Sequence, residues 1–273
     1  MPSRPCTTAR ISSRVPRPLP RSANPTGPAS ETHDCRPAGL GRSMKQVGDF
    51  WLPDIDLRWW SHWGKTRRKT LARYGQGGPK TGDIEAALAH IPRGGLAIDG
   101  GANVGVYSRI MAGHFDRVIA YEPAPDTFDC LARNLRDWGL AGRVEARAAA
   151  LSDRRESVAM KGRRGHRSLS RRVQGAGDIP ALPIDDLGLS ELAFLKLDLE
   201  GYEARALRGA AETLARCRPF VLFEDKPGKA ERSGQIGEAH DILLSLGAHR
   251  VGSIGVRGND WLYGFDQIQV SPL

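Results

Sequence analysis

The chain has 273 residues, of which 40% are hydrophobic and 26% are charged, and its formal net charge is +9. This length and composition suit one large α/β domain with a tail, as in a soluble globular protein. No apolar run approaches the roughly 20 residues that span a bilayer, so no transmembrane segment is predicted. The absence of a signal-peptide core and of close cysteine spacing favours a reducing, cytoplasmic compartment.

Residues 1–43 form a segment rich in proline and arginine. They contain eight of the eighteen prolines and a net charge of +5, with almost no apolar periodicity. We predict that this segment is a disordered basic tail, or that translation truly starts at Met44 and the segment is not part of the protein. A targeting peptide is the alternative, although no amphipathic helix supports it. The remaining +4 is typical of a solvated enzyme surface and argues against a nucleic-acid partner.

Residues 44–82 form a predicted N-terminal extension with a cluster of aromatic side chains. The cluster consists of Phe50, Trp51, Trp59, Trp60 and Trp63. We expect these aromatics to pack the extension onto the domain that follows. A lid over a substrate is the alternative interpretation.

From residue 83 to residue 273, helix and strand patterns alternate in one predicted domain. The expected helices cover residues 83–91, the segment from the glycine turn to about 112, a segment that begins at Pro125, and residues 204–217 and 236–246. The expected strands cover residues 96–99, 117–121, 143–151, 192–198, 220–224, 249–254 and 261–270. Residues 152–183 are expected to be irregular apart from a short strand at 157–160. Strands separated by helices imply a parallel sheet that is covered on both faces.

A glycine-rich turn, Asp99-Gly-Gly-Ala-Asn-Val-Gly105, joins the first of these strands to a helix. Glycine lets the backbone turn tightly, and N–H groups at a helix start can bind polar ligand atoms. A dinucleotide site would have glycine where Ala102 stands, and the Asp99 carboxylate would repel a pyrophosphate. That carboxylate suits the cationic amino group of S-adenosylmethionine. We therefore predict a cofactor site that includes Asp99, Gly101, Ala102, Asn103 and Gly105.

An acidic residue also ends the second strand of the domain, in the sequence Tyr121-Glu122-Pro123. An acid about twenty residues after a glycine turn is the usual acceptor for ribose hydroxyl groups. We predict that Glu122 binds the ribose of an adenosine cofactor, with Pro123 beside it. A surface ion pair is the alternative for Glu122.

These motifs together resemble the FkbM family of methyltransferases. The resemblance lies in residues 99–108, 120–134 and 194–203, continues at 209–210 and 223–224, and covers roughly residues 80–225. It implies a Rossmann-like α/β fold with a seven-stranded sheet, mostly parallel, with the last strand antiparallel. It also implies S-adenosylmethionine as the methyl donor and a hydroxyl acceptor on a sugar, lipid or secondary metabolite.

The third strand departs from the pattern of many methyltransferases. They place an acid or amide just after this strand to hold adenine, whereas this chain has no acid there before Asp153. Backbone groups near Ala149 are expected to hold adenine instead.

The expected catalytic residues follow the fourth strand. Alternation places Lys196, Asp198 and Glu200 on one face of that strand. A buried lysine needs a partner, and Asp198 or Glu224 is expected to supply it. We predict that Asp198 is the base or acceptor-orienting group, that Lys196 tunes it, and that Glu224 lies beside them. The alternative is a structural lysine–carboxylate network that fixes the sheet.

Other polar residues have weaker functional interpretations. A divalent metal on Asp198, Glu224 and Asp225 is possible, but no spacing demands it, so no metal site is predicted. The basic residues 161–172 could hold an anionic acceptor, although a solvated loop is the preferred interpretation. His240 and His249 are isolated in the sequence and are expected to be structural.

Three other functions compete with methylation of a small-molecule or glycolipid acceptor. An RNA 2′-O-methyltransferase would use Asp198 and Lys226, but residues 249–255 contain no matching glutamate. A nicotinamide-dependent oxidoreductase is disfavoured by Asp99 and Ala102. A non-catalytic nucleoside-binding module is the third alternative. The sequence leaves the oligomeric state open.

Overall fold

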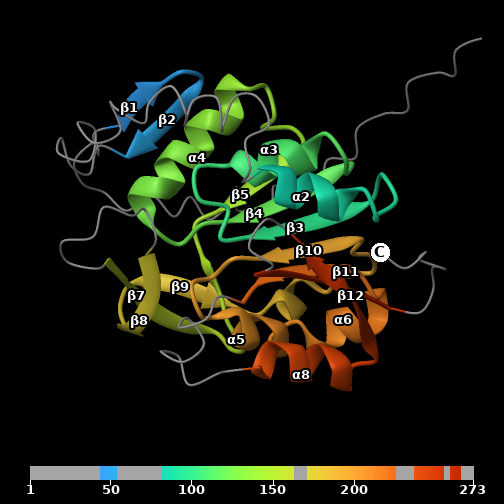
Figure 1. Cartoon of the computed structure of the whole chain (residues 1–273). Coiled ribbons are helices and arrows are strands. Elements are labelled where there is room, and N and C mark those ends of the chain that lie inside the picture. The colour runs from blue at the N-terminus through green and yellow to red at the C-terminus, as the bar shows by residue number, and fades with distance from the viewer. Residues whose placement is uncertain (1–43, 54–80, 163–170, 226–236, 255–258, 266–273) are drawn as a thin grey trace, which may run out of the picture. The chain divides into compact units, whose positions relative to one another are not determined.

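A seven-stranded sheet forms the centre of the computed structural model (Figure 1). The structure describes residues 44–53, 81–162, 171–225, 237–254 and 259–265, all of which belong to one unit, 41–273. In spatial order the strands are β12 (Ala248–Ile254), β13 (Asp260–Phe265), β11 (Phe220–Glu224), β10 (Phe194–Leu197), β3 (Leu96–Gly100), β4 (Arg117–Tyr121) and β5 (Val144–Arg147).

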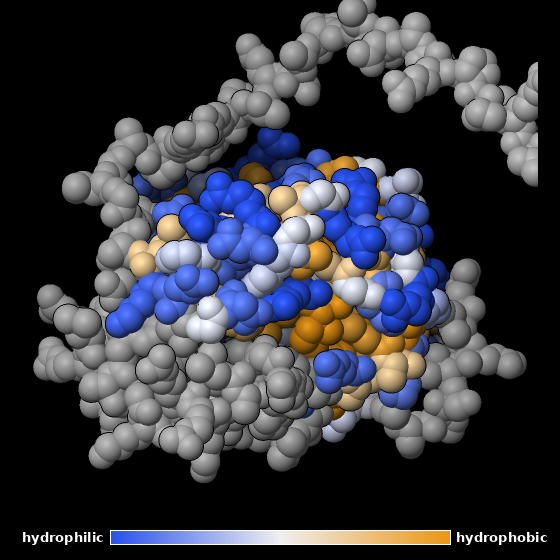
Figure 2. All heavy atoms as spheres, turned by 90° about the horizontal axis from the view of Figure 1, so that it is seen from above, coloured by the Kyte–Doolittle hydropathy of each residue, from blue (hydrophilic) through white to orange (hydrophobic). Residues whose placement is uncertain are grey.

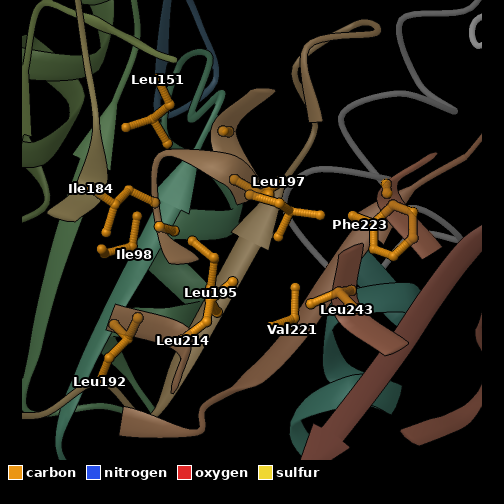
Figure 3. Packing of buried hydrophobic residues seen from close by; sticks show 14 of the residues in the cluster. Ile98, Leu151, Ile184, Leu192, Leu195, Leu197, Leu214, Val221, Phe223 and Leu243 are labelled. Carbon is orange, nitrogen blue, oxygen red and sulfur yellow. The ribbon is translucent and has the colours of Figure 1, made fainter. Parts of the chain in front are cut away.

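Helices cover both faces of this sheet (Figure 1). One face carries α2 (Thr81–Leu88), α3 (Val106–Ala112) and α4 (Pro125–Asp137), and the other carries α5 (Glu203–Arg208), α6 (Ala211–Cys217) and α8 (Glu238–Ser245). Because side chains alternate along a strand, Phe194 packs toward α2 and α3 whereas Leu195 packs toward α5 and α6. Figure 3 shows the second of these two cores, with Ile98, Leu195 and Val221 at its centre.

The sheet confirms the predicted fold class. β3, β4, β5, β10 and β11 run parallel to one another, whereas β13 runs antiparallel to both β11 and β12. The central strands are buried on both faces, which explains their nearly continuous apolar sequences. The carboxyl ends of β3, β4, β10 and β11 therefore meet at one edge of the sheet.

The predicted third strand was wrong in its second half. β5 ends at Arg147, and Ala150–Leu151 forms β6 in a separate four-stranded sheet. That sheet also contains β9 (Ile179–Leu182), β7 (Glu156–Gly162) and β8 (Arg171–Ala176). The short helix η1 (Ile184–Leu187) follows β9 along the chain. Residues 152–183 are thus more regular than expected, because β7 pairs with β8 and β9 in the same segment and β9 also pairs with β6.

The predicted helix over residues 204–217 is two helices, α5 and α6, which meet at Gly209. A Cβ atom on Gly209 would lie 2.0 Å from the backbone oxygen of Ser152. The Gly209 carbonyl also accepts a hydrogen bond from the Asp185 N–H at 2.8 Å. The close approach of the loop after β6 therefore breaks the helix at this glycine.

The first described residues form a hairpin, β1 (Met44–Val47) and β2 (Phe50–Pro53), that packs on α4. Phe50 is buried with its ring 5.1 Å from the Trp138 ring, centroid to centroid. The fully buried Asn134 accepts from the Trp51 N–H at 2.6 Å and donates to the Trp51 and Val104 carbonyls. One amide thus ties the hairpin to the glycine turn. Trp59, Trp60 and Trp63 lie outside the described residues.

We expect Asn134→Leu to lower the free energy of unfolding by about 1–3 kcal/mol, because one buried and two part-buried hydrogen bonds lose their partner. Urea unfolding followed by tryptophan fluorescence measures the change. Arg136→Gln, at an exposed position on the same helix, is the matched control. A loss below about 0.5 kcal/mol would show that the hairpin is not held through Asn134.

The surface in Figure 2 is mostly hydrophilic, with an apolar area that borders on grey residues. Among the described residues, Leu244 is the large apolar side chain that is half exposed. Within the same segments, no helix combines the length and hydropathy needed to cross a membrane.

Candidate functional site

The glycine turn is held against the end of β4 by backbone hydrogen bonds. The N–H groups of Gly101 and Ala102 both donate to the Tyr121 carbonyl, at 3.0 and 2.9 Å. Gly101, Asn103 and Gly105 have positive φ angles of 74°, 53° and 95°. Asparagine tolerates this region better than most residues, and its side-chain oxygen accepts the Val104 N–H at 2.8 Å. The turn is therefore a fixed structure built by its own sequence.

Gly101 is required by its contact with the next strand. A Cβ atom at this position would lie 2.1 Å from the backbone oxygen of Asp198. The glycine thus lets the turn pack directly against the loop that follows β10. This contact joins the predicted cofactor turn to the predicted catalytic loop.

We expect Gly101→Ala to lower the free energy of unfolding by about 2–4 kcal/mol, because a methyl group would collide with backbone and require a left-handed alanine. Chemical denaturation measures the effect. Gly142→Ala is the control, since a Cβ atom there meets nothing within 4 Å. Equal stability of the two variants would contradict the close packing of the turn.

Glu122 connects the glycine turn to the start of α4. Its Oε2 accepts from the Asn103 N–H and its Oε1 accepts from the Ala124 N–H, each at 2.9 Å. The side chain is buried, and this burial raises the pKa of Glu122 to about 7. Each carboxylate oxygen has a second acceptor site. Glu122 can therefore hold the turn and still accept hydrogen bonds from ligand hydroxyl groups.

Asp99 and Lys196 form a buried ion pair between β3 and β10. The Lys196 ammonium donates to Asp99 Oδ1 at 2.8 Å and to the carbonyls of Gly100 and Gly101 at 3.1 and 3.0 Å. Asp99 Oδ2 accepts from the Ser108 hydroxyl at 2.6 Å. Lys196 thus uses all three of its donors inside the protein.

This pair corrects two expectations. The expected partner of Lys196 was Asp198 or Glu224, but strand order places Asp99 opposite it in the register of β3 and β10. Asp99 is also 0% exposed, so it does not present its carboxylate to a ligand. Burial of Lys196 opposes its charge, yet the neighbouring carboxylates keep the pKa of Lys196 above its ordinary value.

The loop after β10 carries Asp198 and Glu200. β10 ends at Leu197, so the alternation that placed Glu200 beside Lys196 does not extend that far, and Glu200 has a φ of 54°. The buried Glu203 holds this loop by accepting the N–H groups of Leu199 at 2.8 Å and Gly201 at 2.9 Å. Sequence reasoning missed this role, although Glu203 lies inside the resemblance block.

Tyr107 is a further site residue that the sequence interpretation missed. Its ring centroid lies 5.3 Å from the Lys196 ammonium. Burial and the nearby charges of Asp260, Asp83 and Asp198 raise the pKa of Tyr107 far above its ordinary value. The tyrosine therefore remains protonated beside acidic residues of α2, of the loop after β10 and of the start of β13. Its place directly after the glycine turn was the available signal.

The remaining predicted residues lie around this edge of the sheet. Glu224 ends β11 opposite Asp260 of β13. Pro123 is half-buried directly after Glu122. Ala149 is buried between β5 and β6, and its N–H donates to the Arg147 carbonyl at 3.0 Å.

Two further observations concern His240 and the metal-ligating residue types. His240 is not isolated, because its ring nitrogens contact Tyr263 and Asp225. In the part of the chain that the structure describes, no group of three or more His, Cys, Asp and Glu side chains is arranged to hold a metal ion. Residues 163–170, the centre of the basic segment, and Lys226 lie outside that part.

Residues 99–250 match the Methyltransferase FkbM domain family, and this span is more than half of the chain. The chain belongs to the FkbM methyltransferase family. The matched span begins at Asp99, includes the turn, Glu122 and the loop after β10, and ends in β12.

Individual relatives are more distant. The methyltransferase sdnD of Sordaria araneosa is 25% identical over 165 residues, which are 46% of this chain and 64% of that protein. The FkbM methyltransferase structure from Methylobacillus flagellatus KT is 22% identical and covers 62% of this chain and 43% of that one, with a TM-score of 0.43. A SAM-dependent O-methyltransferase from Thermotoga maritima is 15% identical, covers 71% and 67%, and has a TM-score of 0.42. The chain thus spans less than two thirds of the first relatives that it matches.

Proposed function

We propose that this chain transfers a methyl group from S-adenosylmethionine to a hydroxyl oxygen of a small-molecule or glycolipid acceptor. The observation that carries the proposal is the buried Glu122, whose carboxylate holds the glycine turn through two backbone hydrogen bonds. The turn packs in place against the backbone of Asp198, directly after β10. Membership of the FkbM family supports methyl transfer as the reaction class.

The residues of the turn fit a cofactor with an adenosine group. Glu122 keeps acceptor sites for the two ribose hydroxyl groups, and its burial strengthens hydrogen bonds to the ionised carboxylate. Ala102 and Asn103 present the turn backbone beside it, and Pro123 and Ala149 lie near the ends of β4 and β5, where adenine would be held. When bound, the cofactor supplies an electrophilic methyl group on a sulfonium.

Asp99 and Lys196 receive a positioning role in this proposal. Their ion pair holds the glycine turn on β10 from inside the protein, because Lys196 uses all three of its donors there and both Asp99 oxygens already accept a hydrogen bond. A ligand ammonium group would instead be held by backbone carbonyls and by the partly exposed acidic residues at the carboxyl ends of β10 and β11. This is the structural lysine–carboxylate network considered from the sequence.

Asp198 is the proposed acceptor-orienting residue. It follows β10, its backbone oxygen contacts the glycine turn, and its side chain is half-buried. Glu203 fixes the loop on which Asp198 and Glu200 lie. Alignment of an acceptor by such a fixed carboxylate supplies several kcal/mol of the barrier. Glu224 is the last residue of the adjacent strand β11, so it lies at the same edge of the sheet as Asp198 and Glu200.

Isothermal titration calorimetry of the full chain with S-adenosylhomocysteine and with NAD tests the donor. We expect binding of S-adenosylhomocysteine alone, because a dinucleotide site would have glycine where Ala102 stands. Binding of neither nucleotide would contradict the proposal and favour a non-catalytic module. A screen with labelled methyl donor over sugars, lipids and RNA then identifies the acceptor. Asp198→Asn is expected to retain donor affinity but lower turnover about 10²-fold, because the acceptor is no longer aligned.

A further inference from the structure

A second polar network lies beside β11, on the sheet face opposite Lys196. His240 Nδ1 lies 2.7 Å from the Tyr263 hydroxyl oxygen, and His240 Nε2 lies 3.1 Å from Asp225 Oδ2. Arg250 Nε donates to the same Tyr263 oxygen at 3.3 Å. The network therefore runs from Arg250 through Tyr263 and His240 to Asp225.

The donor and acceptor roles in this network follow from its ends. Arginine only donates, so the Tyr263 oxygen accepts from Arg250 and its own proton can go to His240 Nδ1. The imidazole then carries its proton on Nε2 and donates it to the Asp225 carboxylate. Every hydrogen bond of the network thus points toward the Asp225 carboxylate.

The surroundings hold the imidazole in a single orientation. Its ring centroid lies 4.9 Å from Phe223 and 5.3 Å from Trp261, both in edge-on geometry. Tyr263 is 0% exposed, whereas the side chains of His240 and Asp225 are 13% and 29% exposed. The network therefore begins in the core and becomes accessible at its carboxylate end. Such an enclosed polar chain costs solvation free energy, which a purely apolar core would avoid.

Asp225 lies where an acceptor would bind under the proposed function. It follows β11, which pairs in parallel with β10 so that Phe223 is opposite Leu197. Asp198 and Asp225 therefore leave neighbouring strands at the same edge, where ligands of open α/β sheets bind. The charged groups around His240 are Asp225 after β11, Arg250 on β12, and Glu238 and Asp241 on its own helix α8.

We propose that Asp225 takes the proton from the acceptor hydroxyl and that His240 is the residue that positions Asp225. This inference rests on the proposed methyl transfer. In the step, the acceptor oxygen forms a bond to the methyl carbon, the carbon–sulfur bond breaks, and sulfur becomes a neutral thioether. The proton released from the acceptor oxygen passes to the Asp225 carboxylate, so charge and atoms balance.

Two nucleosides test this role without an identified acceptor. S-Adenosylhomocysteine has no group at the methyl position, whereas sinefungin has an ammonium group there. A carboxylate that faces the methyl position attracts that ammonium. The ratio of the two dissociation constants, measured by calorimetry on the full chain, therefore reports on Asp225. We expect Asp225→Asn to reduce the preference for sinefungin by about fivefold or more and to leave S-adenosylhomocysteine affinity unchanged.

His240 is tested through the same ratio. His240→Phe keeps the ring packing but loses the donor to Asp225, so we expect a reduced preference for sinefungin. His240→Gln keeps a donor and should restore part of that preference, which a merely structural role would not produce. Asp241→Asn, an exposed acid on the same helix, is the control and should change nothing.

The possible failures are distinguishable. If the wild-type chain binds S-adenosylhomocysteine and the ratio stays unchanged in Asp225→Asn, the role of Asp225 is overturned while the proposed function stands. If Asp225→Asn does not fold, equal ratios in His240→Phe and His240→Gln overturn the positioning role. If the wild-type chain binds neither nucleoside, the proposed function and this inference both fail.

Discussion

Lys196→Met is expected to lower the free energy of unfolding by about 3–5 kcal/mol. The substitution leaves Asp99 buried without its cation, and the carbonyls of Gly100 and Gly101 lose a charged donor. The side chain of Asp99 is 0% exposed, so water cannot replace the lost partner without opening the sheet. Urea unfolding with tryptophan fluorescence measures the loss.

A double-mutant cycle separates the ion pair from general packing. Asp99→Asn removes the other charge, and the double variant Asp99→Asn with Lys196→Met removes both. We expect the double variant to be more stable than the sum of the single losses predicts, because no uncompensated charge remains. Additive losses would show that the two residues act independently. If the single variants do not fold, folding of the double variant carries the same information.

Glu122 is expected to make donor binding depend on pH. Its pKa is raised to about 7 by burial, and the ionised form is the one that accepts hydrogen bonds from ribose hydroxyl groups. Affinity for S-adenosylhomocysteine should therefore rise about tenfold between about pH 6 and about pH 8, if binding holds the carboxylate ionised. Calorimetry across this range measures the effect.

Glu122→Gln is the matched control for that dependence. The amide keeps the size of the side chain but cannot ionise, so the rise in affinity with pH should disappear and affinity at high pH should fall about tenfold. A wild-type affinity that is constant across the range would contradict the assignment of Glu122.

Glu122 should also make the free energy of unfolding depend on pH, in the direction opposite to donor affinity. A raised pKa means that the folded state binds more protons than the unfolded state between about pH 4.5 and pH 7. The free energy of unfolding should therefore decrease as pH rises through this window, by about 3 kcal/mol in total. Glu122→Gln should remove this decrease, and urea titrations at several pH values measure it.

Local patterns predicted most helices and strands of the sheet, and the resemblance to the FkbM family implied its seven strands. Apolar runs and helical periodicity identified β4 and β11 with the bounds that the structure has. The glycine turn and Glu122 were predicted from their spacing, because turn chemistry and strand ends are encoded within about twenty residues. Pairing of β6 with β9 removed residues 150–151 from the predicted third strand, and packing against Ser152 divided the predicted helix over residues 204–217 at Gly209; neither contact is visible in local periodicity.

The sequence by itself determined an alternating α/β chain with a glycine turn, an acid at the end of β4 and acids after β10 and β11. Only the tertiary structure decided which of these groups meet. Lys196 and Asp99 are 97 residues apart, and their pairing depends on β3 lying next to β10 in the sheet. His240 joins Asp225 through the packing of α8 on β11 and β13. Such contacts depend on strand order and register, which are set by the burial of whole faces and not by any local motif.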